Sequence, residues 1–97
     1  MDKALNLLGL ATRANKTRSG AALAEKTVKS GEAYLLLIAG DCAENTMDKF
    51  SSMADYYEVD YKIFATRELL GKFTGGGEKS VVTVLDCGFS EAIKKLL

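Results

Sequence analysis

A six-residue apolar run, YLLLIA at residues 34–39, constrains the fold more than any other part of this 97-residue chain. A strand with one face in water alternates apolar and polar residues, whereas this run is apolar throughout. The segment SVVTVLD at 80–86 is the richest in β-branched residues. Both segments predict strands covered on both faces, in the middle of a layered α/β domain.

Segments with helical periodicity precede the first strand. We expect one helix over 3–13, with Asp2 as its N-cap, and a second that begins at Ser19 or Gly20. Gly31 is placed to end the second helix in a left-handed conformation. The side chains that this helix would turn inward are Leu23, Ala24, Thr27 and Val28.

The alternation continues after residue 40. The stretch GDCAENT would start a third helix, whose free N–H groups Asp41, Asn45 and Thr46 can satisfy. The apolar stripe of that helix is Met47, Phe50, Ala54 and Tyr57. A strand at 61–64, a brief helix at 67–73 capped by Thr66, and a closing helix at 88–97 follow. The order α, α, β, α, β, α, β, α predicts one domain over 1–97, with a central sheet between helices.

Several classes of protein are disfavoured by what the chain lacks. It has no histidine, and its two cysteines, Cys42 and Cys87, form a poor pattern for a metal site. The glycine-rich GGGEKS does not have the spacing of a phosphate-binding loop and precedes a strand. No signal-peptide pattern and no run of about 20 apolar residues is evident. We therefore expect a cytoplasmic protein without enzyme activity, cofactor or metal, and without a membrane partner.

Charge is segregated along a chain whose formal net charge is +0. Residues 1–30 hold six basic and two acidic side chains, whereas 31–61 hold one basic and seven acidic side chains. A helix that starts at Gly20 offers unpaired N–H groups and a partial positive charge to an anionic partner. The basic residues around that start are Arg13, Lys16 and Arg18 in the preceding loop and Lys26 in the helix. The alternative is that the glycines only begin and end a short helix, with the lysines on a solvated face.

Four segments together resemble the ribosomal-protein family that recognises kink-turn RNA, of the L-seven-Ae and L-thirty-e type. They are LLGLATRANKTRSG, KSGEAYLLLIAGDCAENT, YYEVDYKIFATRELLG and SVVTVLDCGFSEAI, in order over almost the whole chain. The resemblance implies a three-layer α/β/α sandwich around a mixed four-stranded sheet. Since the pattern alone predicts three strands, the fourth would be a short strand around Lys16 and Thr17.

The resemblance also implies RNA binding without catalysis, to structured or ribosomal RNA and not to DNA. In the family the second helix begins with Gly, any residue, Asn and Glu, and this start enters the RNA groove beside sheared G·A pairs. Gly20 and Ala21 match the first two positions and Lys26 matches a basic residue one turn later, but Ala22 and Leu23 replace the Asn and Glu. The other implied RNA-contacting positions are Asp41 and the loop of Gly76, Gly77, Glu78, Lys79 and Ser80.

Two other functions stay open from the residues alone. A protein-interaction module would use the acidic third helix, with Asp48, Asp55 and Glu58, to bind a basic partner. A small enzyme or redox sensor would use Cys42 or Cys87, each of which follows an aspartate at the end of a predicted strand. The plainer interpretation of both cysteines is that they are small buried residues at strand ends.

Overall fold

The computed structural model describes residues 2–97, which form five helices and four strands. The helices are α1 (Lys3–Arg13), α2 (Ala21–Lys29), α3 (Glu44–Tyr56), α4 (Arg67–Thr74) and α5 (Cys87–Lys95). The strands are β1 (Thr17–Ser19), β2 (Leu35–Ile38), β3 (Asp60–Ile63) and β4 (Val81–Val84). The helix expected over 3–13 is therefore confirmed, and its predicted N-cap, Asp2, accepts hydrogen bonds from the N–H groups of Ala4 and Leu5.

The strands form one mixed sheet in the order β1-β4-β2-β3. β4 is antiparallel to both of its neighbours, with Val84 opposite Thr17 on one side and opposite Leu35 on the other. β2 and β3 are parallel, with Ile38 opposite Ile63. The fourth strand implied by the family resemblance is β1, which contains Thr17 and pairs at the edge of the sheet.

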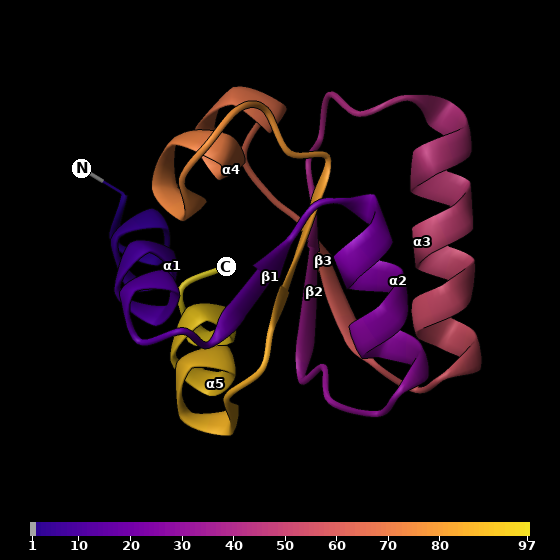
Figure 1. Cartoon of the computed structure of the whole chain (residues 1–97), viewed down its shortest axis with the longest axis horizontal. Helices are drawn as coiled ribbons and strands as arrows, with labels where there is room; N and C mark the ends of the chain where they lie inside the picture. The colour runs from indigo at the N-terminus through magenta and orange to yellow at the C-terminus, as the bar shows by residue number, and fades with distance from the viewer. Residues whose placement is uncertain (1) are drawn as a thin grey trace.

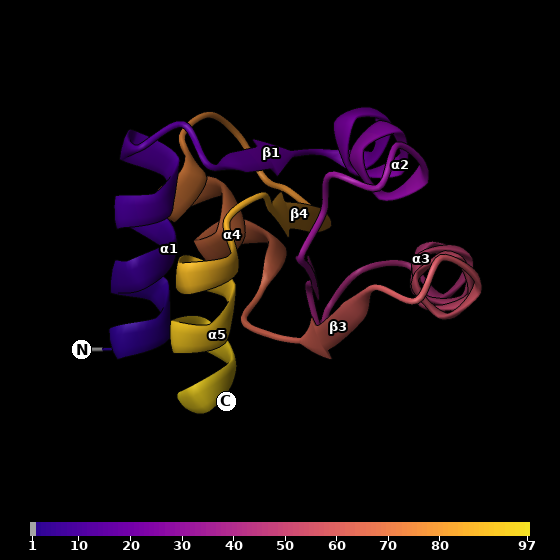
Figure 2. The ribbon, with the colours of Figure 1, turned by 90° about the horizontal axis from the view of Figure 1, so that it is seen from below.

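Helices cover both faces of this sheet, and the predicted three-layer α/β/α sandwich is confirmed. Figure 1 shows α1, α4 and α5 on one side of the strands and α2 and α3 on the other, and Figure 2 shows the same division from below. The first face buries Leu35, Leu37, Val82 and Val84 against helices α1, α4 and α5. The second face buries Leu36, Ile38 and Val81 against α2 and α3. The apolar run in β2 thus supplies alternate residues to two separate cores.

Burial separates the central strands from the edge strand β3. All four residues of β2 and all four of β4 are fully buried. In β3 only Tyr61 is half-buried, and Ile63 is 52% exposed. The expectation of strands covered on both faces is therefore confirmed for β2 and β4.

Two sequence-based expectations about the helices are wrong. Leu23 does not face the core, since it lies in the exposed first turn of α2 and is 45% exposed. The start of α3 has no side-chain cap from Asp41, Asn45 or Thr46; its N-cap residue is Ala43. Backbone bonds from Thr46 and Met47 to the Ala43 carbonyl begin this helix instead.

Candidate nucleic-acid interface

The start of α2 is an open helix N-terminus. Its N-cap, Gly20, has φ +94°, and within residues 2–97 no side chain caps it. The Gly20 N–H donates to the Val81 carbonyl at 2.9 Å, and the Gly20 carbonyl accepts the first helical bond from Ala24. The N–H groups of the exposed residues between them, Ala21, Ala22 and Leu23, have no acceptor inside the helix. These three donors and the positive end of the helix dipole suit an anionic ligand or the acceptor edge of a base.

The other helix starts carry a cap or an acid. Asp2, Thr66 and Asp86 each accept a hydrogen bond at the start of α1, α4 and α5 respectively. α3 has no side-chain cap, but Glu44 lies in its first turn. Of the helices in the described chain, α2 alone combines an absent cap with a first turn that lacks an acidic side chain.

The glycine-rich loop lies beside this start. The carbonyl of its last residue, Ser80, accepts a hydrogen bond from the Ala39 N–H at 2.8 Å. The next residue is Val81, whose carbonyl accepts the hydrogen bond from the Gly20 N–H. The Lys79 N–H donates to the Arg67 carbonyl, and the Lys79 Nζ lies 3.6 Å from the position that a Cβ on Gly76 would take. The structure therefore brings Gly76, Gly77, Glu78, Lys79 and Ser80 to the end of the sheet where α2 begins (Figure 1).

A glycine in α4 fixes the position of this loop. A Cβ built on Gly71 would lie 2.2 Å from the Gly77 carbonyl oxygen, far inside contact distance. Gly71 itself is buried. The backbone of the loop thus packs directly on α4. The same packing keeps the Lys79 backbone next to α4, where its N–H bonds to Arg67.

Asp41 reaches the same end of the sheet, but its carboxylate already has partners. It accepts a hydrogen bond from the Arg67 N–H at 2.8 Å, at the start of α4, and lies 3.7 Å from the Arg67 Nε. The Arg67 Nη1 lies 3.9 Å from the Glu78 carboxylate. Asp41 is therefore bonded to the start of α4, and Arg67 links it to the glycine-rich loop.

Arg67 is the residue at this end that the sequence did not single out. It is half-exposed, and its pairs with Asp41 and Glu78, at 3.7 and 3.9 Å, are exposed contacts of a kind that each contribute at most about 1 kcal/mol. The only sequence signal for Arg67 is its position directly after the N-cap Thr66. Its ion-pair partners could not be predicted, because they lie 26 and 11 positions away along the chain.

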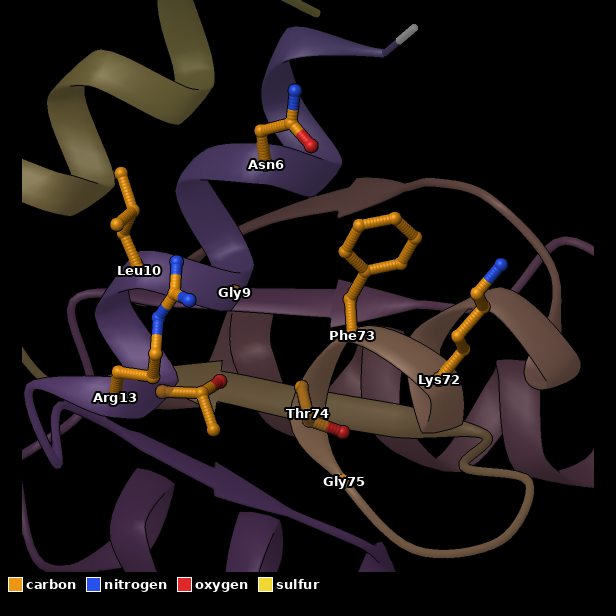
Figure 3. A pocket seen from close by; sticks show the side chains of 9 residues that line it. Asn6, Gly9, Leu10, Arg13, Lys72, Phe73, Thr74 and Gly75 are labelled. Carbon is orange, nitrogen blue, oxygen red and sulfur yellow. The ribbon is translucent and has the colours of Figure 1, made fainter.

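The basic loop before β1 does not join this site. Lys16 precedes β1 and accepts a bond from the Leu85 N–H, whereas Gly20 follows β1 at the other end of the strand (Figure 1). The Arg18 guanidinium turns back toward the start of β1, where it donates to the Thr17 carbonyl at 2.8 Å and to the Asn15 side chain at 3.2 Å. Arg13 lines a groove between α1 and α4 instead (Figure 3).

The lysines of α2 differ in their electrostatic state. Lys29 and Lys49 both contact the Glu25 carboxylate, at 2.7 and 3.0 Å, and hydrogen bonds from these two ammonium groups lower the pKa of Glu25 to about 2. The same contact with Glu25 raises the pKa of Lys29. Lys26 is exposed and has no ion-pair partner within residues 2–97. Lys26 is thus the α2 lysine that is free to meet a phosphate.

The two cysteines do not share a site. Cys42 is half-buried after β2, but Cys87 is exposed at the first position of α5, so the expectation that both are buried is wrong for Cys87. β2 and β4 are antiparallel, which places their carboxyl ends at opposite ends of the sheet. Among residues 2–97 no three His, Cys, Asp or Glu side chains are grouped to hold a metal ion. No helix in this part of the chain has the length and apolarity to span a membrane.

Comparison with known proteins gives relatives over nearly the full chain. The protein described as "RNA-binding protein YlxQ" from Bacillus subtilis (strain 168) is 40% identical over 91 residues, which cover 94% of this chain and 91% of that protein. The protein of the same description from Enterococcus faecium is 33% identical over 96 residues, covering 98% and 91%.

Solved structures agree with the fold. A Bacillus halodurans protein described as having unknown function superposes with a TM-score of 0.94 at 32% identity, covering 99% of this chain and 97% of that one. The Giardia lamblia 15.5kD RNA binding protein superposes with a TM-score of 0.79 at 20% identity, covering 95% and 79%, and shows the same fold. The model of the "Ribosomal protein L7Ae/L30e/S12e/Gadd45 family" matches residues 2–94. With that match and the full-length relatives, the chain belongs to the ribosomal protein L7Ae/L30e/S12e/Gadd45 family.

Proposed function

We propose that this chain is a cytoplasmic, non-catalytic RNA-binding protein that binds structured, kink-turn-like RNA, with ribosomal RNA as its natural source. The open start of α2 is the observation that carries the proposal. Its three N–H donors, at the exposed residues Ala21, Ala22 and Leu23, follow Gly20, whose N–H is bonded to Val81 directly after the glycine-rich loop. The description of the two bacterial relatives as RNA-binding proteins supports the same assignment.

The side chains at this start favour recognition of RNA shape over sequence. Ala22 and Leu23 are exposed, yet neither can donate or accept a hydrogen bond at a base edge. Affinity would then come from backbone donors, from the phosphate contacts of Lys26 and Lys79, and from Arg67 released from Glu78. We therefore expect a preference for a kinked backbone with little discrimination among base pairs.

Binding of the purified chain to a kink-turn RNA and to a straight duplex of equal composition tests the proposal. Each titration is repeated at several salt concentrations, because phosphate contacts weaken steeply with salt. Tighter binding to the kink that persists as salt rises supports shape recognition. Equal binding that collapses with salt makes the chain a general phosphate binder, and no binding to either RNA refutes the proposal.

Ala22→Glu locates the site without threatening the fold. A carboxylate in the first turn of a helix stabilises the helix by about 0.3–1 kcal/mol through its dipole. The same charge repels RNA phosphates from the open N–H groups, so we expect affinity for the kink-turn RNA to fall at least tenfold. The matched control is Ser52→Glu, which adds one negative charge at an exposed position of α3. Equal losses in both variants would remove the start of α2 from the interface.

One observation favours a second candidate, a protein-interaction surface on α3. The acidic side chains Asp48, Asp55 and Glu58 are exposed. The last residue of α3, Tyr56, is 80% exposed, and its ring packs edge-on against that of Tyr57, with 4.9 Å between the ring centroids. Exposed aromatic side chains are enriched at protein interfaces. A pull-down after nuclease treatment that recovers a basic protein and no RNA would support this candidate over the first.

A further inference from the structure

The groove between α1 and α4 is a second feature with the chemistry of a nucleotide site. It has a volume of about 520 Å³, within the roughly 300–1,000 Å³ typical of small-ligand sites, and α1 supplies Gly9, Leu10 and Arg13 to its wall. α4 supplies Lys72 and the half-buried ring of Phe73, and the groove ends at Gly75 (Figure 3). Neither the predicted elements nor the open start of α2 accounts for this combination.

Charge in the groove is positive and unpaired. Neither Arg13 nor Lys72 makes an ion pair within residues 2–97, whereas Lys29, Lys49, Arg67 and Lys94 all do. The Lys72 Nζ lies over the Phe73 ring, 5.9 Å from its centre, in a cation–π arrangement. A phosphate for the cations and a flat base for the ring would complement the two walls.

A glycine leaves the Phe73 ring open. Glycine in the middle of a helix costs about 1 kcal/mol relative to alanine, and Gly9 lies in the interior of α1. A Cβ on Gly9 would stand 3.6 Å from the Phe73 Cδ1, at ordinary contact distance, and would cover part of the ring edge. The chain therefore keeps a less stabilising residue at a place where a methyl group would narrow the groove.

The glycine-rich loop connects the groove to the proposed RNA-binding surface. Gly75 lines the groove and begins the glycine-rich loop, which ends at Ser80 directly before Val81, whose carbonyl accepts the Gly20 N–H at the start of α2. From these observations we infer that the α1–α4 groove binds one nucleotide within a single strand of RNA. Its base would stack on Phe73, and the two phosphates that flank it would contact Arg13 and Lys72. This inference rests on the proposed RNA-binding function and extends it to a strand that flanks the structured site.

Amide chemical shifts of the 15N-labelled full chain, titrated with a five-nucleotide oligouridylate, test this inference. We expect the shifts to move at Gly9, Arg13, Phe73 and Gly75. The double variant Arg13→Ala with Lys72→Ala should weaken binding at least tenfold and lower the salt slope of log K by about 1.4, which corresponds to two phosphates of a single strand. Phe73→Leu keeps an apolar side chain in the core and should weaken binding roughly tenfold through lost stacking.

Controls separate this inference from its alternatives and from the proposed function. Lys62→Ala with Lys95→Ala removes the same charge from exposed positions outside the groove and should change affinity by less than about twofold. Ala22→Glu should leave the groove shifts in place even where binding to kink-turn RNA is lost. Shifts confined to the start of α2 overturn the inference, and so do equal shifts and affinity with polyglutamate, which would mark the groove as a site for an acidic protein.

Discussion

The starts of α2 and α5 are built in opposite ways. At α5 the Asp86 carboxylate accepts a hydrogen bond from the Phe89 N–H at 2.8 Å and completes the helix within the chain itself. At α2 a glycine takes the N-cap position, no side chain within residues 2–97 caps the helix, and three N–H groups stay open. The hydrogen-bonding capacity at the start of α5 is thus used within the chain, whereas the open N–H groups at the start of α2 are the donors that we propose for RNA.

The largest expected effect comes from giving α2 the two base-reading side chains that the family resemblance implies at positions 22 and 23. The double variant Ala22→Asn with Leu23→Glu adds two polar groups at exposed positions, each worth about 1–3 kcal/mol when it pairs with a base edge. We expect the ratio of kink-turn to straight-duplex affinity to rise tenfold or more in titrations at constant salt. The swapped pair Ala22→Glu with Leu23→Asn has the same composition and should show no such rise. Equal ratios for the two would mean that this start does not face the G·A pairs.

Gly20→Ala tests why α2 begins with glycine. The space for a Cβ is open, but φ +94° with ψ 157° is a conformation that only glycine adopts without strain. We expect the free energy of unfolding, measured with urea, to fall by about 1–3 kcal/mol. Gly77→Ala is the matched control, because its Cβ also has open space and its φ is not positive. A loss of equal size at Gly77 would contradict the role of the backbone angle at Gly20.

Removal of the α5 cap should have a smaller effect, confined to stability. Asp86→Ala deletes the acceptor for the Phe89 N–H, at a typical cost of about 1 kcal/mol. Asp86→Asn retains a capping oxygen, so its free energy of unfolding should be close to that of the wild type. RNA affinity should be unchanged in both variants; a change in Asp86→Ala alone would mean that the two helix starts are coupled.

The smallest expected effect is the pH dependence of the Glu25 pair with Lys29 and Lys49, which joins α2 to α3. Since folding lowers the pKa of Glu25 from 4.5 to about 2, its stabilising contribution is complete above pH 4.5 and is lost as pH falls toward 2. The free energies of unfolding in urea of the wild type and Glu25→Gln should therefore differ most near neutral pH and become equal near pH 2. A difference that stays constant with pH would show that the substitution disturbs packing rather than charge pairing.

The sequence predicts the buried strands and the helices well because their patterns are local. The apolar run in β2 and the periodicity of α1 each fix an element without reference to the rest of the chain. β1 is only three residues, Thr17–Ser19, without a hydrophobic pattern, and its pairing with β4 involves residues more than 60 positions away. The family resemblance, and no local pattern, predicts this strand.

Prediction of the site was limited by contacts that are distant in sequence. The open start at Gly20 follows from local residues, but the pairing of Asp41 with Arg67 depends on how the β2–α3 turn meets α4. The same holds for Arg13, which lies near Gly20 in sequence but in a groove against Phe73 in space. Charged residues can be counted from the sequence, but the residues that lie next to them in space can be identified only from the fold.

The position of β4 in the sheet has a consequence for biosynthesis. β1 and β2 are synthesised early, but β1 has no partner strand until β4, at residues 81–84, has been made. Until then β2 also lacks the neighbour on the edge that faces away from β3. Every nascent chain shorter than this leaves both of these strand edges open, and β2 is entirely apolar. The four-stranded sheet can therefore be completed only after β4 is made and has paired with both β1 and β2.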